Sequence, residues 1–121
     1  MQLSRESTEA NVIRAWEPGR IRVGERWIEG SFIVSAQKLV AWSAPAPDAL
    51  DLDDLGAAIE LEPEIIIVGT GTENVLPDVE LMAALAERAI GLEIMTTPAA
   101  CRTYNVLVHE QRRVVAALLN T

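Results

Sequence analysis

A glycine-rich turn directly after an apolar run is the first candidate for chemistry in this sequence. The run Ile65–Val68 is followed by Gly69, Thr70 and Gly71, an arrangement often found at phosphate and dinucleotide sites. A P-loop needs a lysine after its second glycine, but the only lysine of the chain is Lys38. A dinucleotide fingerprint needs a third glycine three residues later, which this turn lacks. We therefore interpret the two glycines as a tight exit from a buried strand, where other residues would not fit.

Polar residues at the start of a later predicted helix form a second candidate. Arg102 and Asn105 are three residues apart, so both side chains can reach one small ligand. The glycine turn and the helix start both lie at the carboxyl ends of strands, where ligands collect in open α/β sheets. Together with helix N–H groups, they predict a site for a carboxylate or phosphate made of Gly69, Thr70, Gly71, Thr97, Arg102 and Asn105. The alternative is that Arg102 pairs with Glu110 or another acid and stabilises loops.

The single cysteine is predicted to be an unreactive thiol. Cys101 lies in the first turns of a helix, where a thiolate is favoured, but a nucleophilic cysteine also needs a base. The only histidine, His109, is two turns away, about 12 Å along the helix axis. One cysteine and one histidine also exclude an all-cysteine or histidine-rich metal site. We therefore predict no catalytic residue, metal site or cofactor.

The elements that must position these residues alternate between helix and strand from residue 51 onward. Asp51 and Asp54 have the spacing of a helix-capping box. Pro77 begins a second helix, and Gly91 ends it. We expect this helix to bury one apolar face, made of Val79, Met82, Leu85, Ala86 and Ala89.

A third helix is predicted from Thr97, as its N-cap, to about Glu110. Its pitch places Cys101, Arg102, Asn105 and His109 on one side, and Ala100, Thr103, Tyr104 and Leu107 on the side that faces the sheet. Apolar runs at 64–68 and 92–95 predict strands, whereas periodicity alone leaves 112–120 as either a buried strand or a continued helix. This order favours a parallel or mixed sheet covered by helices.

Residues 11–43 are rich in β-branched and aromatic residues and predict a β-ribbon layer. Glu17–Arg20 fits a type II turn, and Val23–Arg26 fits a tight hairpin. Three tryptophans, Trp16, Trp27 and Trp42, are expected to pack in the core or between layers, with an interface anchor as the alternative for one of them. Since a ribbon is too small for its own core, we predict a single domain over 1–121, with a ribbon layer at 11–43 and an α/β part at 51–121.

Composition and charge limit the classes of partner. The 121 residues carry a net charge of −8, which disfavours binding to nucleic acid or to an anionic membrane surface. No apolar run approaches the length that spans a bilayer. The polar start MQLSRESTEA differs from a targeting segment, so we expect a cytoplasmic location and a reduced thiol.

Several motifs from Ile65 onward together resemble a family of small domains. They are the Gly-Thr-Gly turn, Leu76-Pro77, Gly91 with Glu93-Ile94-Met95, Thr97, the run Ala99–Asn105, Glu110 and Arg112. With these motifs the chain is similar to the family that includes mitochondrial NADH dehydrogenase (complex I) assembly factor 3 and the adipogenesis-associated Mth-like domain protein. Many members are bacterial or archaeal proteins of unknown function. The chain departs from the family at Gln111, where a glycine usually caps the third helix in a left-handed conformation.

The resemblance implies a three-layer α/β fold. It implies a central mixed sheet of about five strands with the last strand antiparallel to the rest, helices packed on the sheet, and an accessory N-terminal β-ribbon. Residues 112–120 would then be a buried strand. It implies no established activity or substrate, and for the mitochondrial relative it implies a role in assembling a respiratory complex. We therefore predict a non-enzymatic binding or assembly module with a protein partner; the alternative is an enzyme for a small anionic substrate in the predicted cleft.

Overall fold

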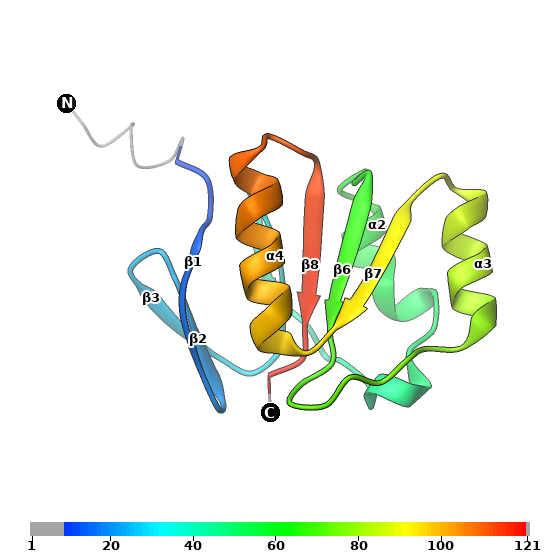
Figure 1. The fold of residues 1–121 in the computed structure, drawn as a ribbon, viewed down its shortest axis with the longest axis horizontal. Helices are drawn as coiled ribbons and strands as arrows, with labels where there is room; N and C mark the ends of the chain where they lie inside the picture. The colour runs from blue at the N-terminus through cyan, green and yellow to red at the C-terminus, as the bar shows by residue number, and fades with distance from the viewer. Residues whose placement is uncertain (1–8, 121) are drawn as a thin grey trace.

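The structure, a computed structural model, describes residues 9–120. These residues form three layers. A five-stranded mixed sheet lies in the middle, helices cover one face, and a further helix and a three-stranded ribbon cover the other (Figure 1). The predicted three-layer α/β fold with a mixed sheet of about five strands is confirmed. Residues 1–8 lie outside the described residues. They make up most of the polar N-terminal segment that is predicted to differ from a targeting signal.

The ribbon consists of β1 (Ile13–Glu17), β2 (Arg20–Val23) and β3 (Arg26–Glu29), which pair antiparallel in that order. Tight turns join the strands where the sequence predicts them. Gly19 and Gly24 occupy the turn positions that need a positive φ, at 88° and 58°.

The ribbon ends earlier than its predicted span of 11–43. The next two strands, β4 (Phe32–Ser35) and β5 (Leu39–Ala41), belong to the central sheet instead. The reason is burial, because the first three residues of β4 are all large and apolar and are buried on both faces of the strand. Such a strand needs cover on both sides, which the central sheet provides and a surface ribbon does not.

The central sheet has the strand order β5-β4-β8-β6-β7, where β6 is Ile65–Gly69, β7 is Gly91–Met95 and β8 is Val114–Leu118. The prediction that the last strand is antiparallel to the rest is wrong, because β8 is parallel to β6 and antiparallel to β4. The cause is the crossover through helix α4 (Thr97–His109), which carries the chain from the end of β7 back to the starting edge of the sheet (Figure 1).

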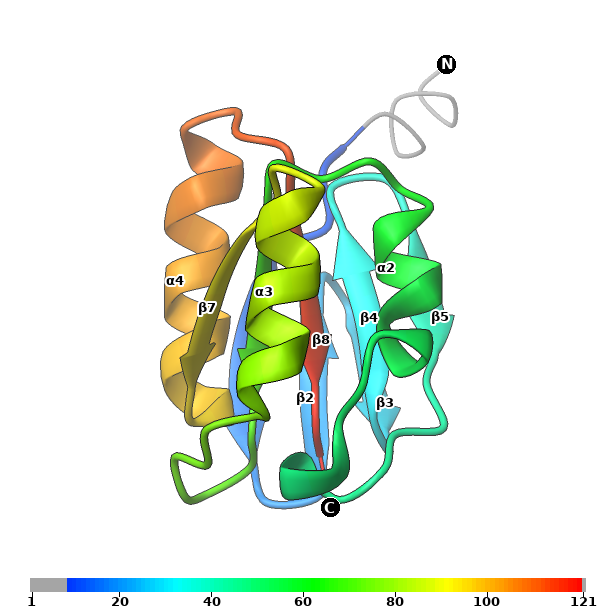
Figure 2. The same ribbon diagram turned by 90° about the vertical axis from the view of Figure 1, so that its right-hand side faces the viewer.

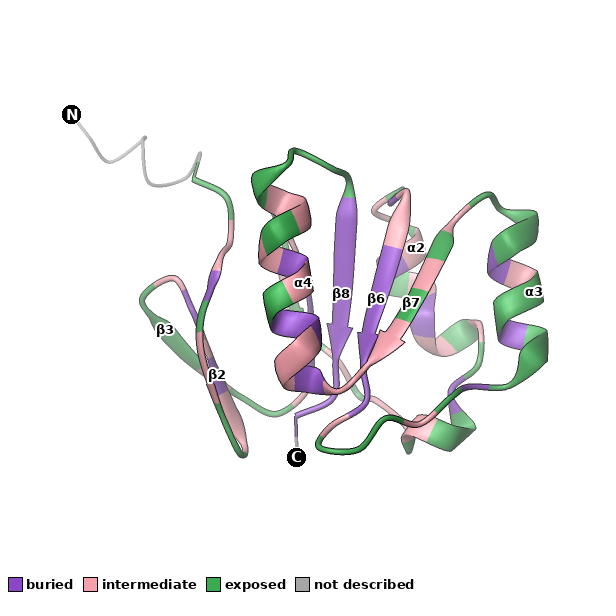
Figure 3. Cartoon of the chain, in the orientation of Figure 1, coloured by how far each residue is buried: buried purple, intermediate pink, exposed green. Residues whose placement is uncertain are grey.

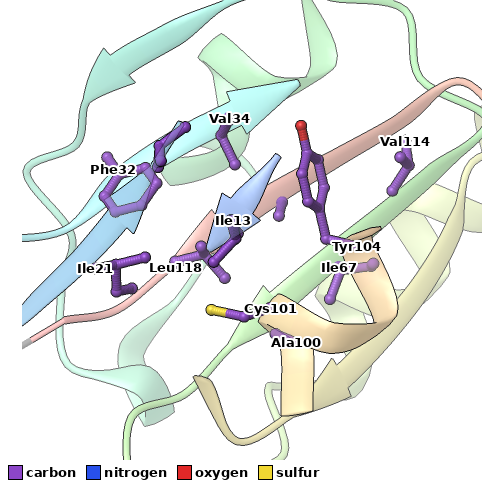
Figure 4. Packing of buried hydrophobic residues seen from close by; sticks show 12 residues of the cluster. Ile13, Ile21, Phe32, Val34, Ile67, Ala100, Cys101, Tyr104, Val114 and Leu118 are labelled. Atoms are coloured by element: carbon purple, nitrogen blue, oxygen red, sulfur yellow. The ribbon is translucent and has the colours of Figure 1, made fainter. Parts of the chain in front are cut away.

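Residues 112–120 include a buried strand, as the family resemblance implies. All five residues of β8 are buried (Figure 3). On one face, β8 contributes to a core shared with α4 and the ribbon, which includes Ile21 of the ribbon and Tyr104 of α4 (Figure 4). On the other face it packs beneath α2 (Gly56–Ile59) and α3 (Val79–Glu87), which lie side by side in Figure 2. Within residues 9–120, no helix combines the length and apolar character needed to cross a membrane.

Two of the three tryptophans pack between layers as predicted. Trp16 lies against the core beneath the ribbon. Trp42 packs on the opposite core, and its indole N–H donates to the carbonyl of Asp54 over 2.9 Å. Trp27 differs, because it is 37% exposed and lies 4.0 Å beneath the guanidinium of Arg20. A cation over an exposed ring keeps this aromatic surface partly covered without a core around it.

The predicted capping box forms. The Asp54 amide donates to Asp51 over 3.1 Å, and the Asp51 amide donates to Asp54 over 2.9 Å. This pair supports two short 3₁₀ and α segments, η2 (Asp53–Leu55) and α2, which follow a first 3₁₀ turn, η1 (Pro47–Ala49).

Helices α3 and α4 end in left-handed residues that are not glycine. Ala89 has a φ of 59° and Gln111 has a φ of 63°. Each is followed by the paired backbone bonds of a Schellman motif, in which Ile90 donates to Leu85 and Arg112 donates to Leu107, both over 3.0 Å. The predicted stop at Gly91 is therefore wrong, because that residue already begins β7. Gln111 adopts the strained conformation that the family's usual glycine would adopt freely.

Replacing Gln111 with glycine should raise the free energy of unfolding by about 1 kcal/mol. A left-handed conformation costs a residue with a Cβ roughly 1–2 kcal/mol, and the greater freedom of glycine in the unfolded chain offsets part of that gain. Urea unfolding of both proteins measures the difference. A loss of stability would show that the Gln111 side chain makes a compensating contact.

Of the five residues predicted to form the buried face of α3, Leu85 is buried, whereas Val79, Met82, Ala86 and Ala89 are exposed. Leu81 and Leu85 pack on the sheet. The strip of Val79, Met82, Ala83 and Ala86 is exposed. Apolar residues lie on most sides of this helix, so either of two apolar faces could pack on the sheet. The face with Leu81 and Leu85, one turn apart, has the larger side chains. Burying this face removes more apolar surface from water, so it is the face that packs on the sheet.

Candidate functional site

The Gly-Thr-Gly turn is a packing device in the structure. A Cβ at Gly69 would lie 2.9 Å from the Cα and Oγ1 atoms of Thr97, which begins α4. Only glycine lets the helix approach the strand end this closely. Gly71 has a φ of 92°, and its N–H donates to Thr97 Oγ1 over 2.8 Å. The interpretation of the turn as a tight exit from a buried strand agrees with these contacts.

The two threonine hydroxyls of the predicted site are bonded within the protein. Thr97 is fully buried, and its hydroxyl donates to the carbonyl of Leu119 over 2.7 Å while accepting from Gly71. The Thr70 hydroxyl donates to the carbonyl of Glu73 over 2.5 Å. Thr97 is not the N-cap, which is Thr96. Both hydroxyls are used in hydrogen bonds to backbone groups, and neither points into an open site.

The start of α4 also lacks the converging free N–H groups that an anion site needs. The Thr97 amide donates to the carbonyl of Gly71 over 2.8 Å, and Pro98 has no amide hydrogen. The Ala100 amide donates to Thr96 over 2.8 Å, as expected inside a helix.

Asn105 holds the first strand of the ribbon against α4. Its amide nitrogen donates to the carbonyl of Ile13 over 2.7 Å, and its oxygen accepts from the Ile13 amide over 2.9 Å. The side chain thus bonds the backbone as a neighbouring strand would. One residue earlier on α4, the Tyr104 hydroxyl donates to the carbonyl of Asn11 over 2.8 Å. These two side chains attach the N-terminal layer to the helix, a role that sequence reasoning missed.

Arg102 lies apart from the glycine turn, in a groove between α4 and the ribbon. The groove has a volume of about 380 Å³ and is lined by Arg102, Arg14, Trp16, Pro98, Cys101, Asn105, Ile13 and Ala15. Among the described residues neither Arg14 nor Arg102 forms an ion pair, so the expected partner Glu110 is not used. Arg14 sits at a β-bulge in β1, an irregularity that can redirect a side chain and that no sequence pattern announces.

The six predicted site residues therefore do not converge on one cavity. Gly69, Gly71 and Thr97 meet one another, whereas Arg102 and Asn105 line the groove beside the ribbon. An anion in that groove would contact guanidinium groups and no glycine-turn amide.

Cys101 is 4% exposed in the core between α4 and the ribbon (Figure 4). The helical pitch predicts Cys101 on the side of α4 that does not face the sheet, and in the structure ribbon residues pack in the same core and help to bury it. Burial raises the pKa of the thiol from 9.0 to about 12, although the charge of Arg102 opposes the shift. The expectation of an unreactive thiol agrees with this position.

Cys101 should react very slowly with iodoacetamide in the native protein at about pH 8, and readily in urea, because only the thiolate attacks. A thiol whose pKa rises on folding from 9.0 to about 12 favours the folded state fully below pH 9, and this contribution is lost as the pH rises toward 12. Alkylation followed by mass spectrometry measures the rate. Rapid native alkylation would contradict burial, and loss of cellular function in a folded Cys101→Ala protein would contradict the inert role.

The family of the chain follows from comparison with known sequences. Residues 13–119 match the family described as protein of unknown function (DUF498/DUF598). The chain belongs to this family. The DUF498/DUF598 match spans both sheets and the helices α2, α3 and α4.

Relatives with more informative names share most of the chain. The NADH dehydrogenase (ubiquinone) 1 alpha subcomplex assembly factor 3 of Danio rerio is 27% identical over 119 residues, which cover 97% of this chain and 68% of that protein. A Francisella tularensis protein named 13 kDa major membrane protein is 29% identical over 124 residues, which cover 98% of this chain and 99% of that protein.

Solved structures show the same fold. A crystal structure of a Bordetella parapertussis protein is 33% identical, with a TM-score of 0.88 over 95% of this chain and 99% of that one. A solution structure of a Mth938-like domain from Bordetella pertussis is 28% identical, with a TM-score of 0.79 over 90% of this chain and 85% of that one. The family match and these similar proteins confirm the resemblance inferred from the motifs.

Proposed function

We propose that this chain is a non-enzymatic module that binds another protein, in the manner of an assembly factor. The observation that carries the proposal is the apolar strip on the solvent side of α3. Leu76, Val79 and Met82 are 72%, 76% and 45% exposed, and Ala83 and Ala86 continue the strip along the helix. A row of apolar side chains at helical spacing on an outer face is typical of a protein-binding surface. The assembly-factor relatives support the same reading.

The enzymatic alternative has less support. Its cleft required Asn105, Thr97 and the glycine turn to face a substrate, and their polar groups are engaged in bonds to the backbone. The groove that holds Arg102 contains a buried thiol with a raised pKa and the guanidinium of Arg14, neither of which is a general base near neutral pH.

A photo-cross-linking amino acid tests the protein-binding proposal in living cells. Placed at Met82, it should capture a specific protein, because this position lies in the middle of the exposed strip. Placed at Val106, an exposed valine on α4 in the opposite layer, it should capture that protein far less. No capture from position 82, or the same captured proteins from both positions, would contradict the proposal.

The predicted cytoplasmic location belongs to the same proposal. Cell fractionation followed by detection of the chain tests it, and recovery in the membrane fraction after a wash at high salt would contradict it.

A small anion remains a second candidate ligand, now in the groove between β1 and α4. The specific observation is that Arg14 and Arg102 line one hollow in a protein of net charge −8, without an ion pair among the described residues. Guanidinium groups bind carboxylates and phosphates through paired N–H donors.

Phosphate, sulfate or a small carboxylate should raise the melting temperature of the parent protein if the groove binds anions. Arg102→Ala and Arg14→Ala should each abolish this shift and change the ligand-free stability by less than about 0.5 kcal/mol, because both side chains are exposed. Arg88→Ala, at an exposed arginine that follows α3, is the matched control and should keep the shift. A parent protein that no anion stabilises would end this candidate.

A further inference from the structure

The exposed strip of α3 lies in the most acidic part of the molecule. Residues 44–93, which include α2 and α3, contain twelve acidic residues and one basic residue, Arg88. The ribbon is different, since residues 11–29 contain four arginines and three glutamates. The acidic residues of this protein are thus concentrated in the segment that carries α2 and α3, the two helices on the outer face of the sheet in Figure 2.

Acidic side chains border the strip on one flank. At about 100° per residue, Val79, Met82, Ala83 and Ala86 form the outer face of α3, and Glu80 and Glu87 lie together beside it, two turns apart. Both glutamates are exposed, and neither forms an ion pair among the described residues. A partner that covers the strip must therefore place charge of the opposite sign along this flank.

A hollow of about 220 Å³ continues this flank at the N-terminal end of α3. It is lined by Asp51, Asp78, Glu80, Leu50, Leu52 and Leu81. Three carboxylates around an apolar floor suit the end of a lysine or arginine side chain, whose methylene groups contact the leucines while the charged group meets the carboxylates. None of these three carboxylates is used in an ion pair within the described part of the chain.

We propose that the partner segment which covers α3 is a basic amphipathic helix, with apolar side chains on the exposed strip and lysine or arginine side chains along Glu80, Glu87 and the acidic hollow. This inference rests on the proposed protein-binding function and adds the chemistry of the partner. The geometry is that of a helix laid against a helix, and α3, at nine residues, offers about 14 Å of contact length. Apolar contact provides affinity, and the charged flank determines orientation and selects against acidic segments.

Labelled peptides of about 18 residues test the chemistry of the partner. One peptide has a leucine-rich face flanked by lysines, and its match has the same face flanked by glutamates. Fluorescence anisotropy should show the basic peptide binding the full chain at least about tenfold more tightly than the acidic one, and more weakly as salt is raised from about 0.05 to 0.5 M.

Variants of the full chain place the binding on α3. Val79→Ser with Met82→Ser should weaken binding of the basic peptide about tenfold or more, and Glu80→Gln with Glu87→Gln should weaken it and reduce its salt dependence. Val106→Ser, at an exposed valine on α4, is the matched control and should change nothing. Equal binding of both peptides, or binding that the α3 variants leave intact, would overturn the proposal.

The cross-linked protein from cells separates this inference from the proposed function. A cross-link from position 82 to a basic amphipathic helix supports both. A cross-link to an acidic or extended segment, or to a second copy of this chain, overturns the partner chemistry and leaves the binding function standing. No cross-link at all removes the proposed function itself.

Discussion

Asn105→Ala should lower the free energy of unfolding by about 3 kcal/mol. The substitution removes both partners of the Ile13 backbone, whose N–H and C=O are bonded to Asn105 over 2.9 and 2.7 Å. Ile13 is 5% exposed, so water does not readily replace these bonds. An orphaned buried donor or acceptor costs roughly 1–3 kcal/mol, and two are created here. Urea unfolding followed by circular dichroism measures the loss, and hydrogen exchange should show it concentrated in β1–β3.

Arg102→Ala is the matched control for Asn105, because Arg102 is exposed on the same helix and has no ion pair among the described residues. Its effect on stability should stay within about 0.5 kcal/mol. A small effect of Asn105→Ala, together with a lost response to anions, would show that Asn105 acts as a ligand-binding residue instead. A large effect with an unchanged anion response is the result that the structure predicts.

Gly69→Ala should destabilise the protein by about 3 kcal/mol, at the upper end of the usual cost of overpacking a core. The added Cβ would lie 2.9 Å from the Cα of Thr97 and 3.1 Å from the Cβ of Ala100, and neither atom belongs to a flexible side chain that can move away. Relief therefore requires α4 to shift from the end of β6. That shift would stretch the bonds that Thr97 makes to Gly71 and Leu119.

Gly56→Ala provides the control for Gly69. Gly56 lies in a helical conformation, with φ −54° and ψ −44°, and apart from its chain neighbours and the backbone of its own helix nothing lies within 4 Å of the position that its Cβ would take. This substitution should stabilise the protein by roughly 0.5–1 kcal/mol, because alanine favours a helix and restricts the unfolded chain. A Gly69→Ala protein as stable as the parent would show that α4 does not press on the strand end. The close approach of strand and helix would then be wrong.

The elements of this fold could be predicted where the determining residues are neighbours in the sequence. The capping box of Asp51 and Asp54 and the hairpin turns at Gly19 and Gly24 depend on local residue types. The end of α3 could not be predicted in this way. Ala89 adopts the left-handed conformation although glycine is available two residues later, because the following strand begins at Gly91.

The candidate site could be predicted only as a set of residue types. Asn105 and Ile13 are 92 residues apart, and Tyr104 and Asn11 are 93 residues apart, so no local pattern shows that their hydrogen-bonding groups are already paired. The same holds for Arg14, which meets Arg102 only because β1 packs beside α4 and carries a bulge. A polar residue that the sequence alone suggests for ligand binding is often already hydrogen-bonded to a backbone group far away along the chain.

By itself, the sequence determined the order of helices and strands from residue 51 to about residue 110 and the chemical character of each segment, because helix caps, turns and periodicity depend on interactions between near neighbours. Its motifs also determined the family. Only the tertiary structure decided the direction of β8, the transfer of β4 and β5 to the central sheet, and which apolar face of α3 meets solvent. These outcomes depend on competition between surfaces for a limited core. That competition is decided by the sizes and positions of side chains far apart in the sequence, which meet only when the layers pack.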